Sequence, residues 1–223
     1  MSLLIFDGVD YRNGEKSILK NITLEIHKGD FISVVGPSGG GKTTLLKLCC
    51  NLTNPTKGGI YFNNKSIHEY AATEYRQRVA YCFQTPYLFG DTVLDNLNFP
   101  YTIRGKKIDM NRIHALFSDF QIDINMLHQS TTNLSGGEKQ RIALIRSILF
   151  VPEVLLLDEV TSALDKDNTL IVEKVIDDLN LQGTTIMWIT HNELQSKKYA
   201  NKILRLENGE IHNFQLNTKE ALL

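Results

Sequence analysis

The amino-acid sequence predicts an α/β fold with a mainly parallel sheet core, an N-terminal antiparallel β subdomain and an inserted α-helical subdomain. Two observations lead to this prediction. Short apolar runs, which are typical of strands covered on both faces, alternate with segments of helical pattern. Between two groups of predicted strands, residues 85–150 carry apolar side chains at helical spacing. A chain of 223 residues that is 42% hydrophobic can bury a core of this size.

The first part of the chain predicts several strands and one helix. Residues 21–27 alternate apolar and polar side chains, which is the period of a half-buried strand. Phe31–Val35 is apolar with little alternation, so we expect a strand covered on both faces, followed by a helix. The stretch GGIYFNN from Gly58 predicts a hairpin strand that ends at an Asn-Asn turn. Another buried strand is expected from Val79.

The second part predicts the helical insertion and two further strands. Within the insertion, helical spacing is clearest at Ile113, Leu116, Phe117 and Phe120. Buried strands are expected at residues 154–159 and 184–191, with a helix over 168–180 between them. This alternation of strand and helix is typical of a parallel sheet covered by helices.

We expect one domain over residues 1–223. Residues 1–84 and 151–223 are predicted to form the core and its β subdomain, and residues 85–150 the helical subdomain. The sequence contains no internal repeat and no flexible linker.

Charge and hydropathy exclude several classes of protein. The 24 basic and 25 acidic residues lack the basic excess of a domain that wraps nucleic acid. The N-terminus has no signal-peptide pattern, and no apolar run approaches the roughly 20 residues of a membrane-spanning helix. The three cysteines show no CxxC spacing, which favours a reducing compartment over a metal site. We therefore expect a soluble, cytoplasmic protein with no nucleic-acid partner.

A glycine-rich loop follows the predicted strand Phe31–Val35. Its residues fit the pattern G-x-x-x-x-G-K-[ST] and are Gly36, Pro37, Ser38, Gly39, Gly40, Gly41, Lys42 and Thr43. In such a loop the backbone N–H groups converge on phosphates, the lysine adds positive charge, and the hydroxyl ligates Mg²⁺. The alternative is a flexible loop that is merely rich in glycine, but the preceding strand and following helix favour a P-loop NTPase.

Two predicted strands end in residues that suit phosphate chemistry. Asp158 and Glu159 follow four buried apolar residues, at the strand end where open parallel sheets bind ligands. Asp158 is predicted to hold Mg²⁺, and Glu159 to orient the attacking water. His191 ends the other strand and is a candidate hydrogen-bond donor to the γ-phosphate. The alternatives are an acidic strand end exposed to solvent and a histidine with a purely structural role.

A second glycine pair lies in the stretch NLSGGEKQR. Ser135 and Glu138 have the spacing of a capping box, which starts a helix. The cap does not account for Gly136 and Gly137, each of which costs up to roughly 1 kcal/mol in a helix relative to alanine. A helix start with bare backbone attracts anions. We therefore expect this element to contact phosphate.

These elements, taken in order, resemble the nucleotide-binding subunit of an ATP-binding cassette (ABC) transporter. The resemblance rests on residues 36–44, Gln84, 134–138, 154–159, 162–165 and His191. It implies that Lys42 and Thr43 are Walker A residues, that Asp158 is the Walker B carboxylate and that Glu159 is the catalytic glutamate. It implies ATP and Mg²⁺ as cofactors. One departure is Val160, where the family commonly has proline.

The same resemblance implies roles for residues outside the phosphate loop. Gln84 would sense Mg²⁺ and the attacking water, and His191 would be the switch histidine. Tyr11 is similar to the aromatic residue that stacks on adenine, although core packing is the alternative for an aromatic near a strand end. The other residues assigned to the nucleotide are Thr44, Ser135, Gly136, Gly137, Glu138 and Asp165.

The resemblance also implies two partners. In a head-to-tail dimer, residues 135–137 of one chain would cover the γ-phosphate held by a second copy. A separate integral membrane permease would dock near Tyr87, Leu88 and Phe89, for which core packing is the alternative. The protein would then lie on the inner face of the cell membrane, bound through the permease. Residues 81–100 resemble a smaller group, the FetA/YbbL-type ATPases linked to iron export.

Other classes remain as alternatives. An importer ATPase for another solute would share all of this chemistry. Soluble relatives that act on DNA or the ribosome carry coiled-coil insertions or a second cassette, neither of which this sequence contains. A monomeric P-loop kinase would not need the element at residues 135–138. A scaffold that binds nucleotide without turnover would not need Glu159 and His191.

Overall fold

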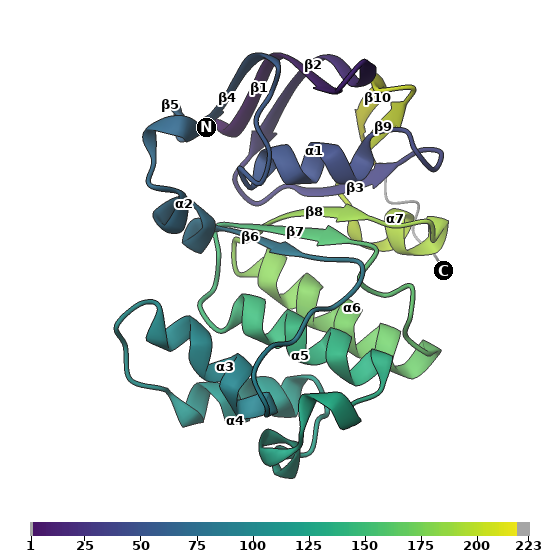
Figure 1. Cartoon of the computed structure of the whole chain (residues 1–223). Coiled ribbons are helices and arrows are strands. Elements are labelled where there is room, and N and C mark those ends of the chain that lie inside the picture. Colours follow the sequence, from purple (N-terminus) through teal and green to yellow (C-terminus); the bar gives the residue numbers. More distant parts are fainter. Residues whose placement is uncertain (1, 218–223) are drawn as a thin grey trace. The chain divides into compact units, whose positions relative to one another are not determined.

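The computed structural model describes residues 2–217 and places their strands in two sheets (Figure 1). The first sheet is antiparallel, with the order β2-β1-β4-β5. Its strands are β1 (Ser2–Asn13), β2 (Lys16–His27), β4 (Lys57–Phe62) and β5 (Lys65–Ser66). This sheet confirms the predicted N-terminal antiparallel element.

The second sheet has the order β10-β9-β3-β8-β7-β6. Strands β9, β3, β8 and β7 are parallel, and β10 is antiparallel to β9. Its strands are β3 (Phe31–Val35), β6 (Val79–Cys82), β7 (Val154–Asp158), β8 (Thr185–Ile189), β9 (Lys202–Glu207) and β10 (Glu210–Leu216). Every residue of β7 and β8 is buried, which is why both strands are continuous apolar runs in the sequence.

The α-helices include those predicted after the glycine-rich loop, within the insertion and near residues 168–180, whereas the helices at residues 72–78 and 193–199 were not predicted. The α-helices are α1 (Lys42–Cys49), α2 (Ala72–Arg78), α3 (Val93–Thr102), α4 (Met110–Asp119), α5 (Gly136–Ile148), α6 (Lys166–Leu181) and α7 (Glu193–Tyr199). The apolar residues that predicted α4 are all buried. The predicted Asn-Asn turn is also present, because Asn63 and Asn64 have φ values of 50° and 61° between β4 and β5.

The chain divides into two compact units. Unit 1 comprises residues up to 81, residues 152–159 and residues from 180 onward, and unit 2 comprises residues 82–151 and 160–179. Unit 2 contains α3, α4 and α5. The sequence-based boundaries at residues 85 and 150 stay a proposal.

Strands β1, β9 and β10 were not predicted, and β6 differs from its prediction. β1 was not predicted because shifts of register between Phe6 and Val9 break its alternation. β9 and β10 were not predicted, although the Asn-Gly pair at 208–209 is a hairpin signal. β6 was expected to be buried, but Ala80 and Tyr81 are only partly buried because β6 is an edge strand.

The core of unit 1 joins its two sheets through α1. The buried side chains Phe6 and Ile22 of the antiparallel sheet, Leu46 of α1, and Ile32 and Leu156 of the parallel sheet belong to one apolar cluster. This packing fixes the segment between β3 and α1 at both of its ends.

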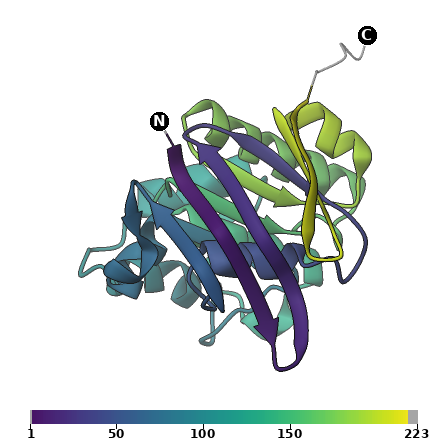
Figure 2. The same ribbon diagram turned by 90° about the horizontal axis from the view of Figure 1, so that it is seen from above.

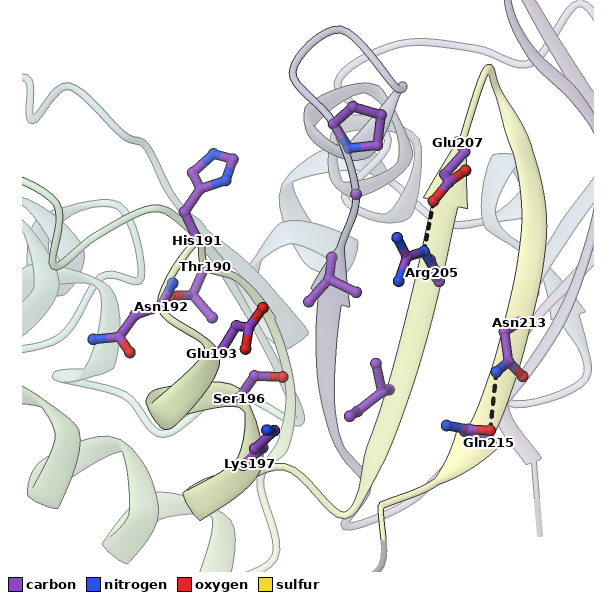
Figure 3. Close-up of a pocket in the computed structure, with 14 residues that line it drawn as sticks. Thr190, His191, Asn192, Glu193, Ser196, Lys197, Arg205, Glu207, Asn213 and Gln215 are labelled. Atoms are coloured by element: carbon purple, nitrogen blue, oxygen red, sulfur yellow. Dashed lines mark hydrogen bonds and ion pairs between the residues drawn. The ribbon is translucent and has the colours of Figure 1, made fainter.

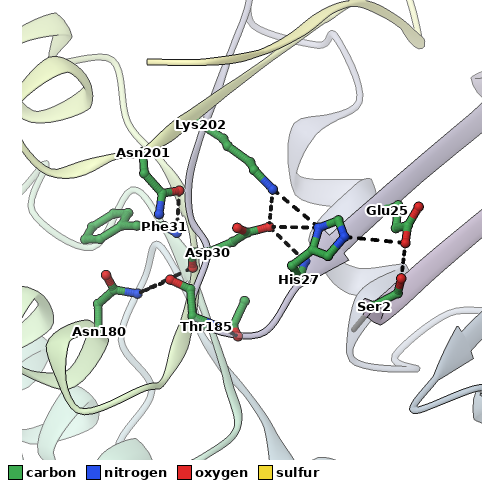
Figure 4. A network of polar contacts seen from close by, with 10 residues as sticks. Ser2, Glu25, His27, Asp30, Phe31, Asn180, Thr185, Asn201 and Lys202 are labelled. Carbon is green, nitrogen blue, oxygen red and sulfur yellow. Dashed lines mark hydrogen bonds and ion pairs between the residues drawn. The ribbon is translucent and has the colours of Figure 1, made fainter. Parts of the chain in front are cut away.

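A polar network lies at the amino end of β3 (Figure 4). The Asp30 carboxylate accepts hydrogen bonds from the Lys202 ammonium at 2.7 Å and from the backbone N–H of His27 at 2.8 Å. The Asn201 side chain accepts from the backbone N–H of Phe31 at 3.0 Å. Because these contacts join β2, β3 and β9, they fix the start of β3 relative to the neighbouring strands.

The β9–β10 hairpin turn approaches β2 and the glycine-rich loop. Figure 2 shows the yellow hairpin beside the long purple β1–β2 hairpin. The backbone carbonyl of Gly209 accepts a hydrogen bond from the N–H of Lys20 at 2.8 Å. The backbone N–H of Gly209 donates to the Gly40 carbonyl at 3.2 Å. The C-terminal hairpin therefore supports the loop between β3 and α1.

Replacing Gly209 with alanine is expected to lower the free energy of unfolding by about 2 kcal/mol or more. Gly209 has φ +81°, and a Cβ there would lie 2.3 Å from the Ile18 carbonyl oxygen. Urea denaturation measures the effect. The matched control is Gly14→Ala, because Gly14 has φ +59° but no atom within 4 Å of an added Cβ. If both variants lowered the free energy of unfolding equally, the close approach of Gly209 to Ile18 would not account for the loss of stability.

Candidate functional site

The glycine-rich loop connects β3 to α1 within unit 1. A Cβ on Gly36, whose φ is +143°, would lie 2.0 Å from the Leu206 carbonyl oxygen, so no other residue fits against β9 here. The loop tip at residues 37–39 is exposed. No side chain caps the start of α1 at Gly41, which leaves the first-turn N–H groups available to an anion.

Lys42 is held against the loop. The side chain is 6% exposed, and its ammonium donates to the carbonyl oxygens of Gly36 and Pro37, each at 2.9 Å. These contacts fix the positive charge beside the N-terminus of α1. Thr43 is exposed and Thr44 is partly buried in the same first turn. The predicted Walker A residues therefore bring a buried ammonium and the Thr43 and Thr44 hydroxyls to the first turn of α1.

Asp158 ends β7 and joins the loop to the parallel sheet. Its side chain is buried, and its two carboxylate oxygens have different partners. Oδ1 accepts from the Thr43 hydroxyl at 3.2 Å, and Oδ2 accepts from the Tyr81 hydroxyl at 2.6 Å. Tyr81 was not identified from the sequence as a site residue, because β6 appeared to be an ordinary buried strand. The available signal was its polar hydroxyl, three residues before Gln84.

Glu159 and His191 lie together at the ends of β7 and β8. His191 Nε2 and Glu159 Oε1 are 2.9 Å apart, and the histidine is 53% exposed. The Glu159 backbone N–H donates to the Ile189 carbonyl at 3.1 Å. Glu159 has φ +50°, a left-handed conformation that is uncommon for glutamate and costs of order 1–3 kcal/mol. Strand β7 ends just before this residue, and the Glu159 carboxylate lies against His191.

A polar turn holds the His191 backbone. The buried Thr190 hydroxyl donates to the Gln195 side chain at 2.5 Å and accepts from the Asn192 N–H at 3.0 Å. The Asn192 side chain caps α7 by accepting from the N–H groups of Leu194 and Gln195. Thr190, His191 and Asn192 line a cavity of about 620 Å³ that also borders Gly36 and Pro37 (Figure 3).

Tyr11 lies in β1 opposite Leu19 of β2, and its ring packs against the core of unit 1. The side chain is only partly buried. Because the Tyr11 side chain both contacts the core and remains partly exposed, its stacking on adenine stays a prediction.

Unit 2 contains the second glycine pair, and its predicted capping box is present. The N–H of Glu138 donates to the Ser135 hydroxyl at 3.3 Å, and Glu138 Oε2 accepts from the Ser135 N–H at 2.8 Å. Hydrogen bonds from the Ser135 hydroxyl and N–H lower the pKa of Glu138. An added Cβ on Gly136 would meet no atom within 4 Å, and one on Gly137 would meet only the Leu164 side chain at 3.3 Å. The fold of unit 2 therefore does not itself require these glycines.

Gln84 and Asp165 also belong to unit 2. Gln84 is exposed, and the carbonyl of the preceding Phe83 accepts from the buried Gln140 side chain of α5 at 3.3 Å. Asp165 is exposed and accepts from the Asn168 N–H at 2.8 Å and from its side-chain amide at 2.6 Å. These bonds lower the pKa of Asp165. The structure brings Lys42, Thr43, Asp158, Glu159 and His191 together in unit 1, and residues 135–138 with Leu164 in unit 2.

The three residues predicted to dock the permease, Tyr87, Leu88 and Phe89, differ in exposure. Tyr87 is 73% exposed, whereas Leu88 and Phe89 are partly buried. The Phe89 ring packs edge to face on Phe99 at 4.7 Å and against the Arg146 guanidinium at 4.9 Å. Arg146 also donates to the Tyr87 carbonyl at 2.9 Å. The segment therefore presents Tyr87 from a fixed backbone.

The three cysteines are free and buried. Burial raises the pKa of the Cys50 thiol to about 12 and that of Cys82 to about 11, so neither is a reactive thiolate at neutral pH. Among residues 2–217, no three His, Cys, Asp or Glu side chains cluster as a metal site. In the same residues, no helix combines the length and apolarity needed to cross a membrane.

Comparison with known proteins decides the class. The family model described as ABC transporter matches residues 19–162, more than half of the chain. The chain belongs to the ABC transporter family. It is an ABC-type ATP hydrolase and the ATP-binding subunit of a transporter. The predicted family and enzyme class are confirmed.

Curated relatives cover almost the whole chain. It is 42% identical over 206 residues to the probable iron export ATP-binding protein FetA of Escherichia coli (strain K12), covering 92% of this chain and 91% of the relative. It is 37% identical to the phosphate import ATP-binding protein PstB of Thermotoga maritima, covering 89% and 84% of the two chains. ABC relatives with different cargoes thus resemble this chain throughout.

Solved structures confirm the α/β fold of the ABC family. The chain matches the ATP-binding cassette MJ0796, in a dimeric post-hydrolysis state bound to ADP and Pi, with a TM-score of 0.86 and 27% identity. That match covers 96% of this chain and 98% of the other. A second dimeric structure of MJ0796, described as a bacterial ABC transporter cassette, matches with a TM-score of 0.85 and 25% identity.

Proposed function

We propose that two copies of this chain bind two MgATP molecules head to tail, hydrolyse them and thereby drive a separate integral membrane permease. The observation that carries the proposal is a group of side chains in unit 1 at the start of α1 and at the ends of β7 and β8. Its members are Lys42, Thr43, Asp158, Glu159 and His191. Each member supplies a function that phosphoryl transfer to water needs.

The phosphate loop would hold the triphosphate. The uncapped N–H groups at the start of α1 and the Lys42 ammonium provide donors and positive charge for the β- and γ-phosphates. Ser38 and Gly39 would contribute further backbone donors, since they lie at the exposed tip of the loop. Tyr11 is the proposed stacking partner for adenine.

The donor set suits Mg²⁺. The Thr43 hydroxyl and the Asp158 carboxylate are hard oxygen ligands within hydrogen-bond distance of each other. Mg²⁺ is usually bound through one or two carboxylates together with substrate phosphates and waters, so one acidic residue is enough. Gln84 belongs to unit 2, and its predicted role as Mg²⁺ ligand and sensor stays a prediction. When bound, Mg²⁺ would neutralise charge on the phosphate oxygens.

Glu159 would orient the water that attacks the γ-phosphorus. The new bond joins the water oxygen to phosphorus, the bond to the β–γ bridging oxygen breaks, and ADP and phosphate are released. A carboxylate can accept the hydrogen bond, and then the proton, of that water. His191 Nε2 lies 2.9 Å from Glu159 Oε1, which supports a role in orienting Glu159 before ATP binds. With ATP bound, Nε2 would donate to the γ-phosphate instead.

The second copy would complete each site. Ser135, Gly136 and Gly137 form a helix start whose surroundings in unit 2 are open. The dimeric ADP- and Pi-bound state of a similar cassette supports this arrangement. Size-exclusion chromatography with MgATP tests it, since dimers are expected with MgATP and monomers after ATP is consumed. A monomer under both conditions would contradict the shared site.

The proposed cargo is iron, exported from the cytoplasm through a permease bound at the inner membrane face. The similarity to FetA over almost the whole chain supports this cargo. An importer for another solute is the alternative, which the similarity to PstB favours.

A cargo test begins with a permease encoded beside this gene. The permease is co-expressed with this chain, co-purified and reconstituted into vesicles. ATP-dependent movement of iron, with no movement of phosphate, is the expected result. Movement of phosphate alone would identify the protein as part of an importer instead of an iron exporter. Failure to co-purify would reject this permease as the partner.

A further inference from the structure

We propose that Tyr81 is a positioning residue of the magnesium site, whose hydroxyl holds the Asp158 carboxylate in the orientation that binds the ion. This inference rests on the proposed function, in which Asp158 and Thr43 bind Mg²⁺. Neither the family motifs nor the sequence pattern assigns a role to Tyr81.

The geometry separates the two oxygens of the carboxylate. Tyr81 donates to Oδ2 of Asp158 at 2.6 Å, and Thr43 donates to Oδ1 at 3.2 Å. The shorter contact is in the range of strong hydrogen bonds to a carboxylate. Because Tyr81 engages the oxygen away from Thr43, its contact does not compete with a metal placed beside the Thr43 hydroxyl.

The position of Tyr81 is fixed independently of the site. It lies in β6, which the sheet order places next to β7, the strand that carries Asp158. Its ring packs against the apolar cluster of unit 1. The hydroxyl therefore projects from a supported ring, and it fixes the carboxylate rotation that β7 alone leaves free.

Hydrogen bonds behind a ligand carboxylate affect metal binding. Such outer contacts fix the orientation of the ligand, and their loss typically weakens metal affinity 10- to 100-fold. Without the Tyr81 hydroxyl, the Asp158 carboxylate would be free to rotate. Binding of the metal ion would then have to fix its orientation, which weakens the affinity for the ion. Phosphate contacts made by the glycine loop do not involve this hydroxyl.

The test is Tyr81→Phe, which keeps the ring and removes the hydroxyl. Mn²⁺ serves as the probe, and its affinity for the ATP-saturated protein is measured by electron paramagnetic resonance. We expect Mn²⁺ to bind about 10-fold more weakly than to the wild type. ATP affinity measured in EDTA is expected to stay within about twofold of the wild-type value, because loop contacts are intact.

The matched control is Tyr70→Phe. Tyr70 is also in unit 1, and its hydroxyl donates to the Phe62 carbonyl at 2.9 Å, away from Asp158. This control is expected to leave Mn²⁺ affinity unchanged.

Three outcomes overturn the inference. Unchanged Mn²⁺ affinity in Tyr81→Phe would show that the hydroxyl does not position Asp158. Equal weakening of Mn²⁺ binding and of ATP binding in EDTA, with a lowered thermal midpoint, would show a general structural role. If the wild-type protein itself bound Mn²⁺ no better with ATP than free ATP does, the proposed function would fail together with the inference.

Discussion

Replacing Glu159 with glutamine is expected to slow ATP hydrolysis by about 100-fold or more while leaving ATP binding intact. The amide keeps the size of the side chain but cannot accept the proton of the attacking water. Its oxygen can still meet His191, which lies 2.9 Å from the carboxylate. Because hydrolysis would no longer separate the subunits, MgATP is expected to trap the variant as a dimer. Phosphate release and size-exclusion chromatography measure the two effects.

The control for this prediction is Glu210→Gln. Glu210 forms a surface ion pair with Lys20 at 3.5 Å, and such pairs contribute little to stability. This variant is expected to behave as the wild type does. Unchanged turnover in Glu159→Gln would assign the base to another residue, and a monomeric variant in MgATP would contradict the dimer mechanism.

Replacing Gly137 with leucine is expected to remove turnover, by about 100-fold or more, while ATP still binds to the phosphate loop. The side chain would cover backbone N–H groups that the proposal directs at the γ-phosphate of the second copy. We expect Gly137→Leu to fold, because a Cβ added at this position contacts only the flexible end of the Leu164 side chain, at 3.3 Å. Loss of a helical glycine can even stabilise the chain by up to about 1 kcal/mol. ATP titration, turnover and urea denaturation of one preparation separate these effects.

Ser118→Leu is the matched control for Gly137→Leu. Ser118 is exposed near the end of α4 in the same unit, so it receives the same side chain away from α5. Normal turnover is expected in the control. If Gly137→Leu lost ATP binding and turnover to the same extent, the glycine would have a structural role, and the cross-subunit contact would be unsupported.

Local patterns in the sequence predicted much of the fold because strands and helices have short characteristic periods. Phe31–Val35, the helix after the glycine loop and the run that ends at Asp158 were each recognisable from a few neighbouring residues. The capping box of Ser135 and Glu138 was equally local. Motif spacing likewise identified the family, since each motif is a short continuous stretch.

Irregular strands were less predictable. The bulges of β1 interrupt the twofold period on which strand prediction depends. The C-terminal hairpin had a turn signal at Asn208 and Gly209, but its position under the glycine loop depends on long-range contacts to Lys20 and Gly40. Edge exposure of β6 likewise follows from strand order, which no local pattern encodes.

The sequence by itself determined the chemistry available to this protein: a phosphate loop, an acidic pair, a histidine and a capped helix with bare glycines. Only the tertiary structure decided which of these groups meet. Tyr81 and Asp158 are 77 residues apart, yet their side chains form a 2.6 Å hydrogen bond. The order of strands in a parallel sheet depends on crossover connections and on packing of the whole core. A contact between two neighbouring strands therefore cannot be predicted from local sequence patterns.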